Sequence, residues 1–189
     1  MKLGTIVLFL AWSTWLFSGN VDTFVKASRA QVGTTLTYNP EYRYIKYPMG
    51  DIPISKGVCT DVLVRSFRGM DIDLQERIYE DKKKFPKRYK GLYYTDKLDP
   101  NIDHRRVKNI QAYLISRGYR VNDNFKPGDI VVWKLKARNG KSLDHIGICS
   151  DKRNAHGEPL IIHNINSGAK EEDVLRNYKI VDHFRVFER

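Results

Sequence analysis

The sequence predicts a protein of the α+β class, with helices in the first half of the domain and an antiparallel sheet in the second. Three segments between residues 58 and 116 repeat apolar side chains at three- and four-residue intervals, the period of a helix packed on one face. Between residues 129 and 187, short apolar runs alternate with turn residues, which is typical of strands. Helices and strands are thus segregated along the chain, as they are in α+β domains.

The expected helices cover residues 58–68, 72–84 and 107–116. In the first of them Cys59 lies in the first turn. The second carries a dense run of charges, predicts an exposed helix and ends before Pro86. The third has its apolar residues on one face and is stopped by Gly118.

Four strands are expected, at residues 129–135, 145–150, 160–165 and 183–187. The first is announced by the turn dipeptide Pro127-Gly128. A polar insertion, residues 151–159, predicts a hairpin loop between the second and third strands. The tyrosine-rich segment 41–56 contains two prolines and a glycine, so we expect an extended loop that packs onto the domain.

The first 20 residues have the composition of an export segment. Lys2 precedes an apolar run from Leu3 to Phe17, which is shorter than the ~20 residues of a membrane span. The run therefore predicts a secretory signal peptide and a periplasmic or extracellular protein. An uncleaved anchor is the alternative, because no small-x-small cleavage site follows immediately. We expect a signal peptide or anchor at 1–20, a polar lead-in at 21–40 and a single domain at 41–189.

The chain is strongly basic, with 33 Lys and Arg against 22 Asp and Glu and a net charge of +11. This balance favours an anionic partner, such as the carboxylates and phosphates of a cell-wall polymer. The sequence lacks a recognised nucleic-acid-binding module, so we expect no nucleic-acid partner. The alternative explanation of the charge is solubility alone.

Cys59 and His145 are the candidate nucleophile and base. A cysteine in the first turn of a helix is next to unpaired N–H groups and the positive end of the helix dipole, which stabilise a thiolate. The same N–H groups can bind an oxyanion. His145 opens an apolar strand, where a side chain has a rigid support and can reach a helix terminus.

A third polar group must hold the imidazole by its other nitrogen. His163 and Asn164 on the following strand are the candidates, and strand alternation allows only one of them to face His145. We favour His163. Cys149, four residues after His145 and about 13 Å further along the strand, is expected to be a packed thiol, although a Cys59–Cys149 disulfide is the alternative.

Residues Asp103, His104, Arg105 and Arg106 precede the third helix. They predict a substrate-binding wall in which Arg105 or Arg106 binds a carboxylate of the ligand with two hydrogen bonds. The alternative is a helix start capped by Asp103, with solvated arginines. The histidines lack the spacing of metal ligands, so we expect neither a metal site nor a cofactor.

These motifs resemble those of the papain-like cell-wall peptidases of the NlpC type. The matching segments, in the order that the family has them, are residues 57–61 (GVCTD), 126–131 (KPGDIV), 144–148 (DHIGI) and 162–164 (IHN). The resemblance implies a papain-like fold, a Cys-His hydrolase and a tyrosine about a dozen residues before the nucleophile. Tyr47 lies twelve positions before Cys59, with Tyr44 as its rival. Val58 and Thr60 flank the cysteine where the family often has Asp and Ser.

A more specific resemblance is to the bacterial family called domain of unknown function 1287. It spans residues 38–188 through five ordered motifs, GVCTDV, NIDHRRV, PGDIVVW, HIGICSD and IIHNI. Together the two resemblances imply an exported cysteine hydrolase that cleaves an amide bond, with the peptides of peptidoglycan as the expected substrate. The alternatives are a catalytically silent wall-binding module of the same fold and a thiol acyltransferase or esterase.

Overall fold

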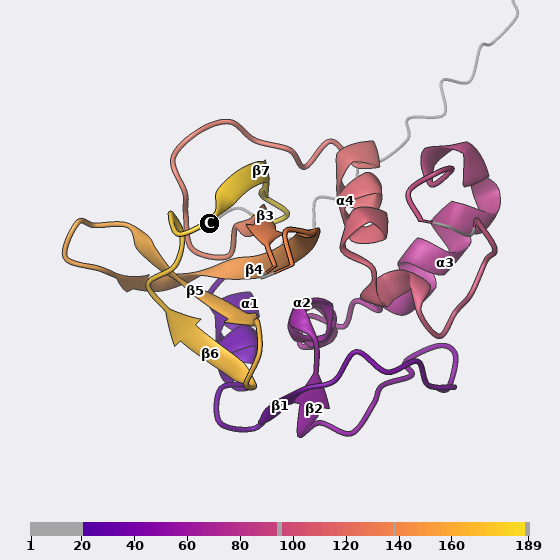
Figure 1. Ribbon diagram of the computed structural model, residues 1–189, viewed down its shortest axis with the longest axis horizontal. Coiled ribbons are helices and arrows are strands. Elements are labelled where there is room, and N and C mark those ends of the chain that lie inside the picture. Colours follow the sequence, from indigo (N-terminus) through magenta and orange to yellow (C-terminus); the bar gives the residue numbers. More distant parts are fainter. Residues whose placement is uncertain (1–20, 94–95, 138, 188–189) are drawn as a thin grey trace, which may run out of the picture.

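In this computed structural model the described residues are 21–93, 96–137 and 139–187. The predicted signal peptide or anchor at 1–20 lies outside them. The main sheet has five antiparallel strands in the order β6-β5-β4-β3-β7 (Figure 1). Its strands are β3 Ile130–Lys136, β4 Ser142–Arg153, β5 Pro159–Asn164, β6 Ala169–Glu172 and β7 Lys179–Phe184. Two short strands, β1 Thr37–Tyr38 and β2 Lys56–Gly57, form a separate parallel pair.

The helices precede the main sheet in the chain, which confirms the predicted α+β class. They are α1 Val21–Arg29, α2 Cys59–Arg68, α3 Leu74–Lys84 and α4 Val107–Ser116, with 3₁₀ turns η1 Pro86–Arg88 and η2 Asp103–Arg105. Helices α1 and α2 pack against β4, and α3 and α4 lie together to one side (Figure 1). Gly118 ends α4 and Gly128 forms the turn before β3, both with positive φ, as the sequence predicts.

Several elements differ from the expectation, and three of them bear on the core and the site. Residues 21–29, expected to be part of a lead-in, form α1, whose buried residues Val21, Phe24, Val25 and Ser28 have helical spacing. Strand β6 was not expected, because its sequence AKEE has little strand propensity; pairing with β5 creates it. The last strand ends at Phe184 rather than residue 187, since Phe187 leaves the sheet and packs against Phe24.

The sheet has an apolar cluster on each side. The larger one joins α1, α2, α3 and α4 to side chains such as Ile146, Ile148 and Phe184. The smaller one contains Trp133, Cys149 and Leu175. Because adjacent residues of a strand point to opposite faces, β4 contributes to both clusters: Ile146 and Ile148 face the helices, whereas His145 shares its face with Cys149 and lies beside Trp133.

The segment 41–56 is extended and without helix or strand up to β2, as expected. The buried guanidinium of Arg65 on α2 holds it in place, with hydrogen bonds to the Asp51 carboxylate at 2.9 and 3.0 Å and to the carbonyl oxygen of Lys56 at 2.9 Å. No helix in the part of the chain that the structure describes is long and apolar enough to cross a bilayer.

Candidate active site

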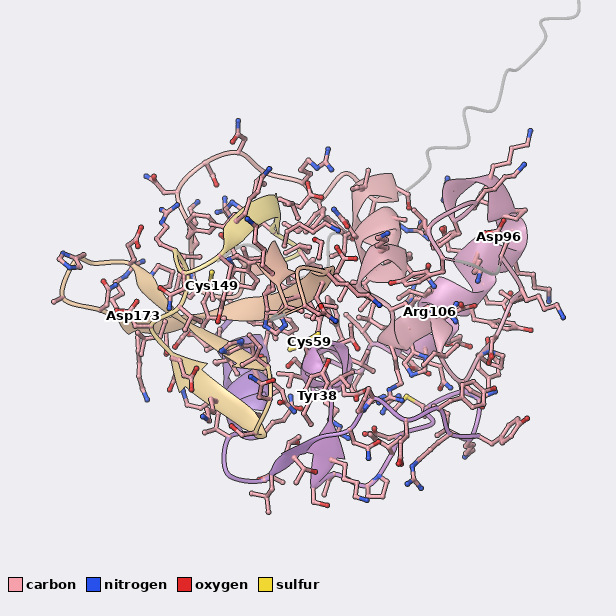
Figure 2. All side chains as sticks on the ribbon, in the orientation of Figure 1. Tyr38, Cys59, Asp96, Arg106, Cys149 and Asp173 are labelled. Carbon is pink, nitrogen blue, oxygen red and sulfur yellow. The ribbon has the colours of Figure 1, made fainter. Side chains whose placement is uncertain are left out.

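Cys59 is the first residue of α2, as predicted. Val58 before it is extended, with φ −115° and ψ −178°, so the chain enters the helix directly at the thiol. Figure 2 shows Cys59 at the start of α2, with Tyr38 of β1 near it. The thiol is buried but borders a cleft of about 250 Å³. The start of α2 thus brings its free N–H groups and the thiol to the same opening.

Hydrogen bonds from both sides fix the backbone around Cys59. The Asp61 carboxylate accepts from the N–H of Val58 at 2.7 Å and from Arg105 Nε and Nη2 at 2.9 and 3.0 Å. On the other side, Asn164 Nδ2 donates to the carbonyl oxygen of Gly57 at 3.0 Å. Asn164 therefore supports the segment that carries the nucleophile.

Burial raises the pKa of the Cys59 thiol to about 12. Backbone N–H groups of Ile146, Thr60 and Cys59 itself lower the pKa, while the Asp61 carboxylate raises it further. From its position at the helix terminus, a thiolate was the expected form of Cys59. Instead the thiol is neutral at pH 7, because desolvation outweighs the N–H groups.

His145 and His163 are brought together. Nε2 of His145 and Nδ1 of His163 are 2.8 Å apart, and both rings are buried. Gly147 permits this approach: a Cβ there would lie 2.8 Å from Ile161 Cγ2 and 3.1 Å from His163 Cβ. The ring of Trp133, the residue opposite His145 on β3, lies 5.8 Å from the imidazole. The structure thus places His163, and not Asn164, against His145.

His145 is adjacent to the nucleophile through its backbone. The residue after it, Ile146, belongs to the same apolar cluster as Cys59, and its backbone N–H lowers the pKa of the thiol. The hydrogen bonds of the described residues do not include one between the thiol and the imidazole. Burial lowers the pKa of His145 to about 3, with His163 adding to the effect, so His145 is neutral at pH 7. Its Nδ1 is the ring nitrogen not used by His163.

The cleft at Cys59 is lined by both polar and apolar side chains. Its lining residues are Tyr38, Pro40, Val58, Cys59, Tyr93, Ile102, Arg105, Arg106, Val107 and Asp144. Burial raises the pKa of Tyr38 to about 12 and the Asp61 carboxylate adds to the effect, so its hydroxyl remains a donor at neutral pH. Tyr38 reaches the cleft because β1 pairs with β2 two residues before the nucleophile.

Tyr47 is not at this site, which corrects the expectation drawn from its spacing. Its hydroxyl donates to Glu80 Oε1 at 3.2 Å, and its ring packs against Tyr79 at 4.8 Å. Its rival Tyr44 is 88% exposed. The turn at residues 47–49 carries Tyr47 away to α3, whereas Tyr38 lies beside Cys59. The two-residue strands β1 and β2 leave no periodic signal from which Tyr38 could have been found.

Two of the four residues expected to form a substrate-binding wall are structural. The buried carboxylate of Asp103 pairs with Lys82 at 2.8 Å and accepts from the N–H of Asp99 at 2.9 Å. It does not cap α4, whose N-cap is Arg106. Arg105 is saturated by the Asp61 carboxylate and by two backbone carbonyls of residues 39 and 41, so it has no donor pair to offer a ligand.

The other two residues have different environments. His104 is buried, its Nδ1 has no hydrogen-bond partner, and burial together with Arg68 and Arg105 lowers its pKa to about 4. Arg106 lines the cleft, with its guanidinium 4.8 Å from the centre of the Tyr93 ring and 3.5 Å from Asp103 Oδ1. Arg106 is therefore the one of the four that can face a ligand from the cleft wall (Figure 2).

A larger cavity of about 660 Å³ adjoins the cleft. Asp144, the residue before His145, lines both of them, and it forms an ion pair with Lys134. The second cavity lies between α4 and the sheet and also carries Arg88 and Lys108. The two spaces therefore meet at Asp144, and the larger one carries basic side chains.

Cys59 and Cys149 are both free thiols, and they belong to different apolar clusters. In Figure 2 Cys149 lies on the sheet, away from the start of α2. Cys149 is buried, and burial raises its pKa well above the usual value. Across the described ranges, no three His, Cys, Asp or Glu side chains are grouped so that they could hold a metal ion.

Comparison with known proteins identifies the family of this chain. A family model described as "Domain of unknown function (DUF1287)" matches residues 25–186. The chain belongs to this family. An Escherichia coli (strain K12) relative named "Uncharacterized protein YijF" is 43% identical over 166 residues, which cover 85% of this chain and 78% of the relative. No solved structure matches this DUF1287 chain. The family match includes Cys59, His145 and His163, together with the second half of α1.

Proposed function

We propose that this DUF1287 protein is an exported cysteine hydrolase that cleaves an amide bond, with Cys59 as nucleophile and His145 as base. One observation carries the proposal: the thiol at the start of α2 borders a cleft and shares an apolar cluster with Ile146, while the residue before Ile146, His145, is held by His163 at 2.8 Å. Nucleophile, base and orienting group are the three parts of such a site. The resemblance to NlpC-type peptidases supports the same assignment.

The reaction starts from neutral partners. As Cys59 Sγ attacks the carbonyl carbon, its proton passes to His145 Nδ1, and the hydrogen bond to His163 holds the ring in place. A neutral imidazole is able to accept this proton, because burial keeps His145 unprotonated at pH 7. The proton then moves to the leaving amine, and a thioester on Cys59 remains. Water, activated by His145, hydrolyses the thioester and restores the thiol.

Donors for the developing oxyanion are present at the same opening. The backbone N–H groups of Cys59 and Thr60 point to the start of α2, and the Tyr38 hydroxyl lines the cleft. Donors fixed before the reaction stabilise a tetrahedral oxyanion more than a neutral carbonyl. Tyr38 thus takes the place that the sequence assigned to Tyr47.

The proposed substrate is a peptide of the cell wall. The basic protein, the predicted export segment and the guanidinium of Arg106 on the cleft wall favour an anionic peptide. The adjoining cavity of about 660 Å³ supplies room for a residue next to the scissile bond. These features support a stem or cross-link peptide of peptidoglycan as the substrate.

Digestion of purified sacculi tests the proposal. The protein, the Cys59→Ala variant and, as a matched control, the Cys149→Ala variant are incubated with sacculi, and the soluble products are identified by mass spectrometry. We expect new muropeptides from the protein and the control, and none from Cys59→Ala. Equal products from Cys59→Ala would contradict a cysteine mechanism. Products that carry an added acyl acceptor would instead identify a transferase.

A wall-binding module is the second candidate, and one observation favours it. Cys59 is buried and its thiol is neutral, as in a structural cysteine. The two cysteines are free, however, so the structure does not contain the Cys59–Cys149 bridge that would silence the site. The test is whether each protein sediments with sacculi. If Cys59→Ala sediments as strongly as the unaltered protein and neither releases products, the wall-binding module is the better assignment.

A further inference from the structure

We infer that Glu172 on β6 is a positioning residue that fixes the tautomers of His163 and, through it, of His145. Glu172 Oε2 lies 3.5 Å from His163 Nε2, on the side of the ring opposite His145. The sequence does not point to Glu172, because β6 has no strand signal. The catalytic consequence of this inference rests on the proposed function, whereas the assignment of the tautomers does not.

Glu172 is the acceptor available to a buried, unpaired nitrogen. His163 Nε2 is buried and makes no hydrogen bond, since 3.5 Å is longer than the usual 2.7–3.2 Å of such bonds. The Glu172 side chain is 33% exposed and its other oxygen lies 3.3 Å from Lys170 Nζ. A small rotation of this partly exposed carboxylate completes the hydrogen bond.

The position of the carboxylate decides which nitrogen carries each proton. A carboxylate accepts but does not donate, so it favours the proton of His163 on Nε2. His163 Nδ1 then has a lone pair, and the 2.8 Å contact requires His145 to donate its own Nε2–H. His145 Nδ1 is consequently left with a lone pair. With the opposite tautomers, that nitrogen would carry a proton and His145 would be unable to act as a base.

The same chain stabilises the charge that forms during the reaction. When His145 Nδ1 accepts the thiol proton, the imidazolium keeps its Nε2–H on His163, and the His163 Nε2–H faces Glu172. No proton has to leave this chain of three residues. The charged groups that face His163 are Glu172 and Lys170. Burial lowers the pKa of His163, Glu172 raises it and Lys170 lowers it further.

Nuclear magnetic resonance tests the tautomers without a substrate. Two-bond ¹H–¹⁵N correlation of the ¹⁵N-histidine-labelled protein identifies the protonated nitrogen of each ring. We expect the Nε2–H form for both His145 and His163 in the unaltered protein. In Glu172→Ala a measurable fraction should change to the Nδ1–H form, whereas Glu172→Gln, which keeps an acceptor oxygen, should retain the original tautomers. A His163 protonated on Nδ1 in the unaltered protein, or no change in Glu172→Ala, would overturn the inference.

The second test measures kcat and KM of the variants, with Asp173→Asn as the matched control. Asp173 is the next residue, is exposed and accepts a hydrogen bond from Asn154 Nδ2 at 2.9 Å. We expect Glu172→Ala to lower kcat about tenfold with KM nearly unchanged, and Glu172→Gln to lower it less. A loss no larger than that of Asp173→Asn contradicts the positioning role. The expected tautomers in a protein that releases no muropeptides would uphold the inference and refute the proposed hydrolase.

Discussion

At the scale of single residues, two opposing effects determine the pKa of the Cys59 thiol. Helix N–H groups stabilise a thiolate, while burial removes the water that a thiolate needs. Desolvation dominates, and the pKa of the thiol rises to about 12. The neighbouring imidazole has a pKa lowered to about 3 by the same burial. Both groups are neutral at pH 7, so in the proposed reaction the proton moves while the substrate carbonyl is being attacked.

The rate of Cys59 alkylation should therefore depend steeply on pH. With a pKa of about 12, the thiolate fraction is small at pH 7 and increases with pH. We expect the rate with iodoacetamide to rise about tenfold per pH unit between pH 7 and 9, measured by peptide mapping. Cys149, mapped in the same samples, is the internal control for unfolding. A rate that is constant from pH 6 to 8 would show a thiolate–imidazolium pair instead.

His104 should make the fold sensitive to acid. Its pKa is about 4 in the folded protein and about 6.5 in an unfolded chain. Between these values the unfolded chain binds a proton that the folded one does not, so stability is lost as the pH falls from about 6.5 to 4. The loss from this residue is up to about 3 kcal/mol.

Denaturation with urea at pH 7 and pH 4.5 measures this effect. We expect His104→Gln to have a smaller difference between the two pH values than the unaltered protein. The control His156→Gln, in an exposed loop, should keep the full difference. An undiminished difference in His104→Gln would show that His104 is protonated in the folded state.

At the scale of elements, the start of α2 is held by contacts distant in sequence. Arg105 of η2 connects Asp61 with the carbonyl oxygens of Asn39 and Glu41, while Asn164 of β5 binds Gly57 from the other side. The charged segment 103–106 was expected to bind substrate because sequence does not show which guanidinium already has a partner. The contacts assign Arg105 to the scaffold and leave Arg106 on the cleft wall.

Replacing Arg105 by Lys should destabilise the protein although the charge is kept. A lysine cannot reproduce the two hydrogen bonds to Asp61 or the bonds to the two carbonyls. We expect a loss of about 3 kcal/mol in the free energy of unfolding, measured by urea denaturation. Arg43→Lys, at an exposed pair with Glu41, is the control and should change stability little. Equal effects of the two substitutions would contradict this role for Arg105.

At the scale of the whole molecule, helix α1 packs into the core that the other helices share with the sheet. Phe24 packs against Phe67 of α2 at 5.0 Å and against Phe187, after β7, at 4.9 Å between ring centres. Arg29 at the end of α1 also binds Glu171 of β6, at 2.9 Å. The first helix, the nucleophile helix and the C-terminal segment therefore share one core.

Phe24→Ala should lower the stability of the entire domain. Removing a fully buried aromatic ring costs about 3–5 kcal/mol, because it loses apolar burial and leaves a cavity. Chemical denaturation followed by both tryptophan fluorescence and circular dichroism should show one transition at lower denaturant. Val32→Ala, at an exposed residue just after α1, is the control. If only α1 unfolded and the rest kept its stability, α1 would not be part of the common core.

The sequence by itself determined the elements whose pattern is local. It predicted the order of helices and strands, the position of Cys59 in the first turn of α2 and membership of the family, since periodicity and motifs are properties of short segments. It did not predict α1, although its buried residues have helical spacing, because the segment around it is polar. It did not predict β6, whose strand exists only through pairing with β5.

Only the tertiary structure decided which side chains meet at the site. It placed Tyr38 rather than Tyr47 beside Cys59, His163 rather than Asn164 against His145, and Glu172 behind them. It also made the thiol neutral, since burial is not a property of the residue itself. These features depend on contacts between residues far apart in the chain, and such contacts leave no pattern within any one segment.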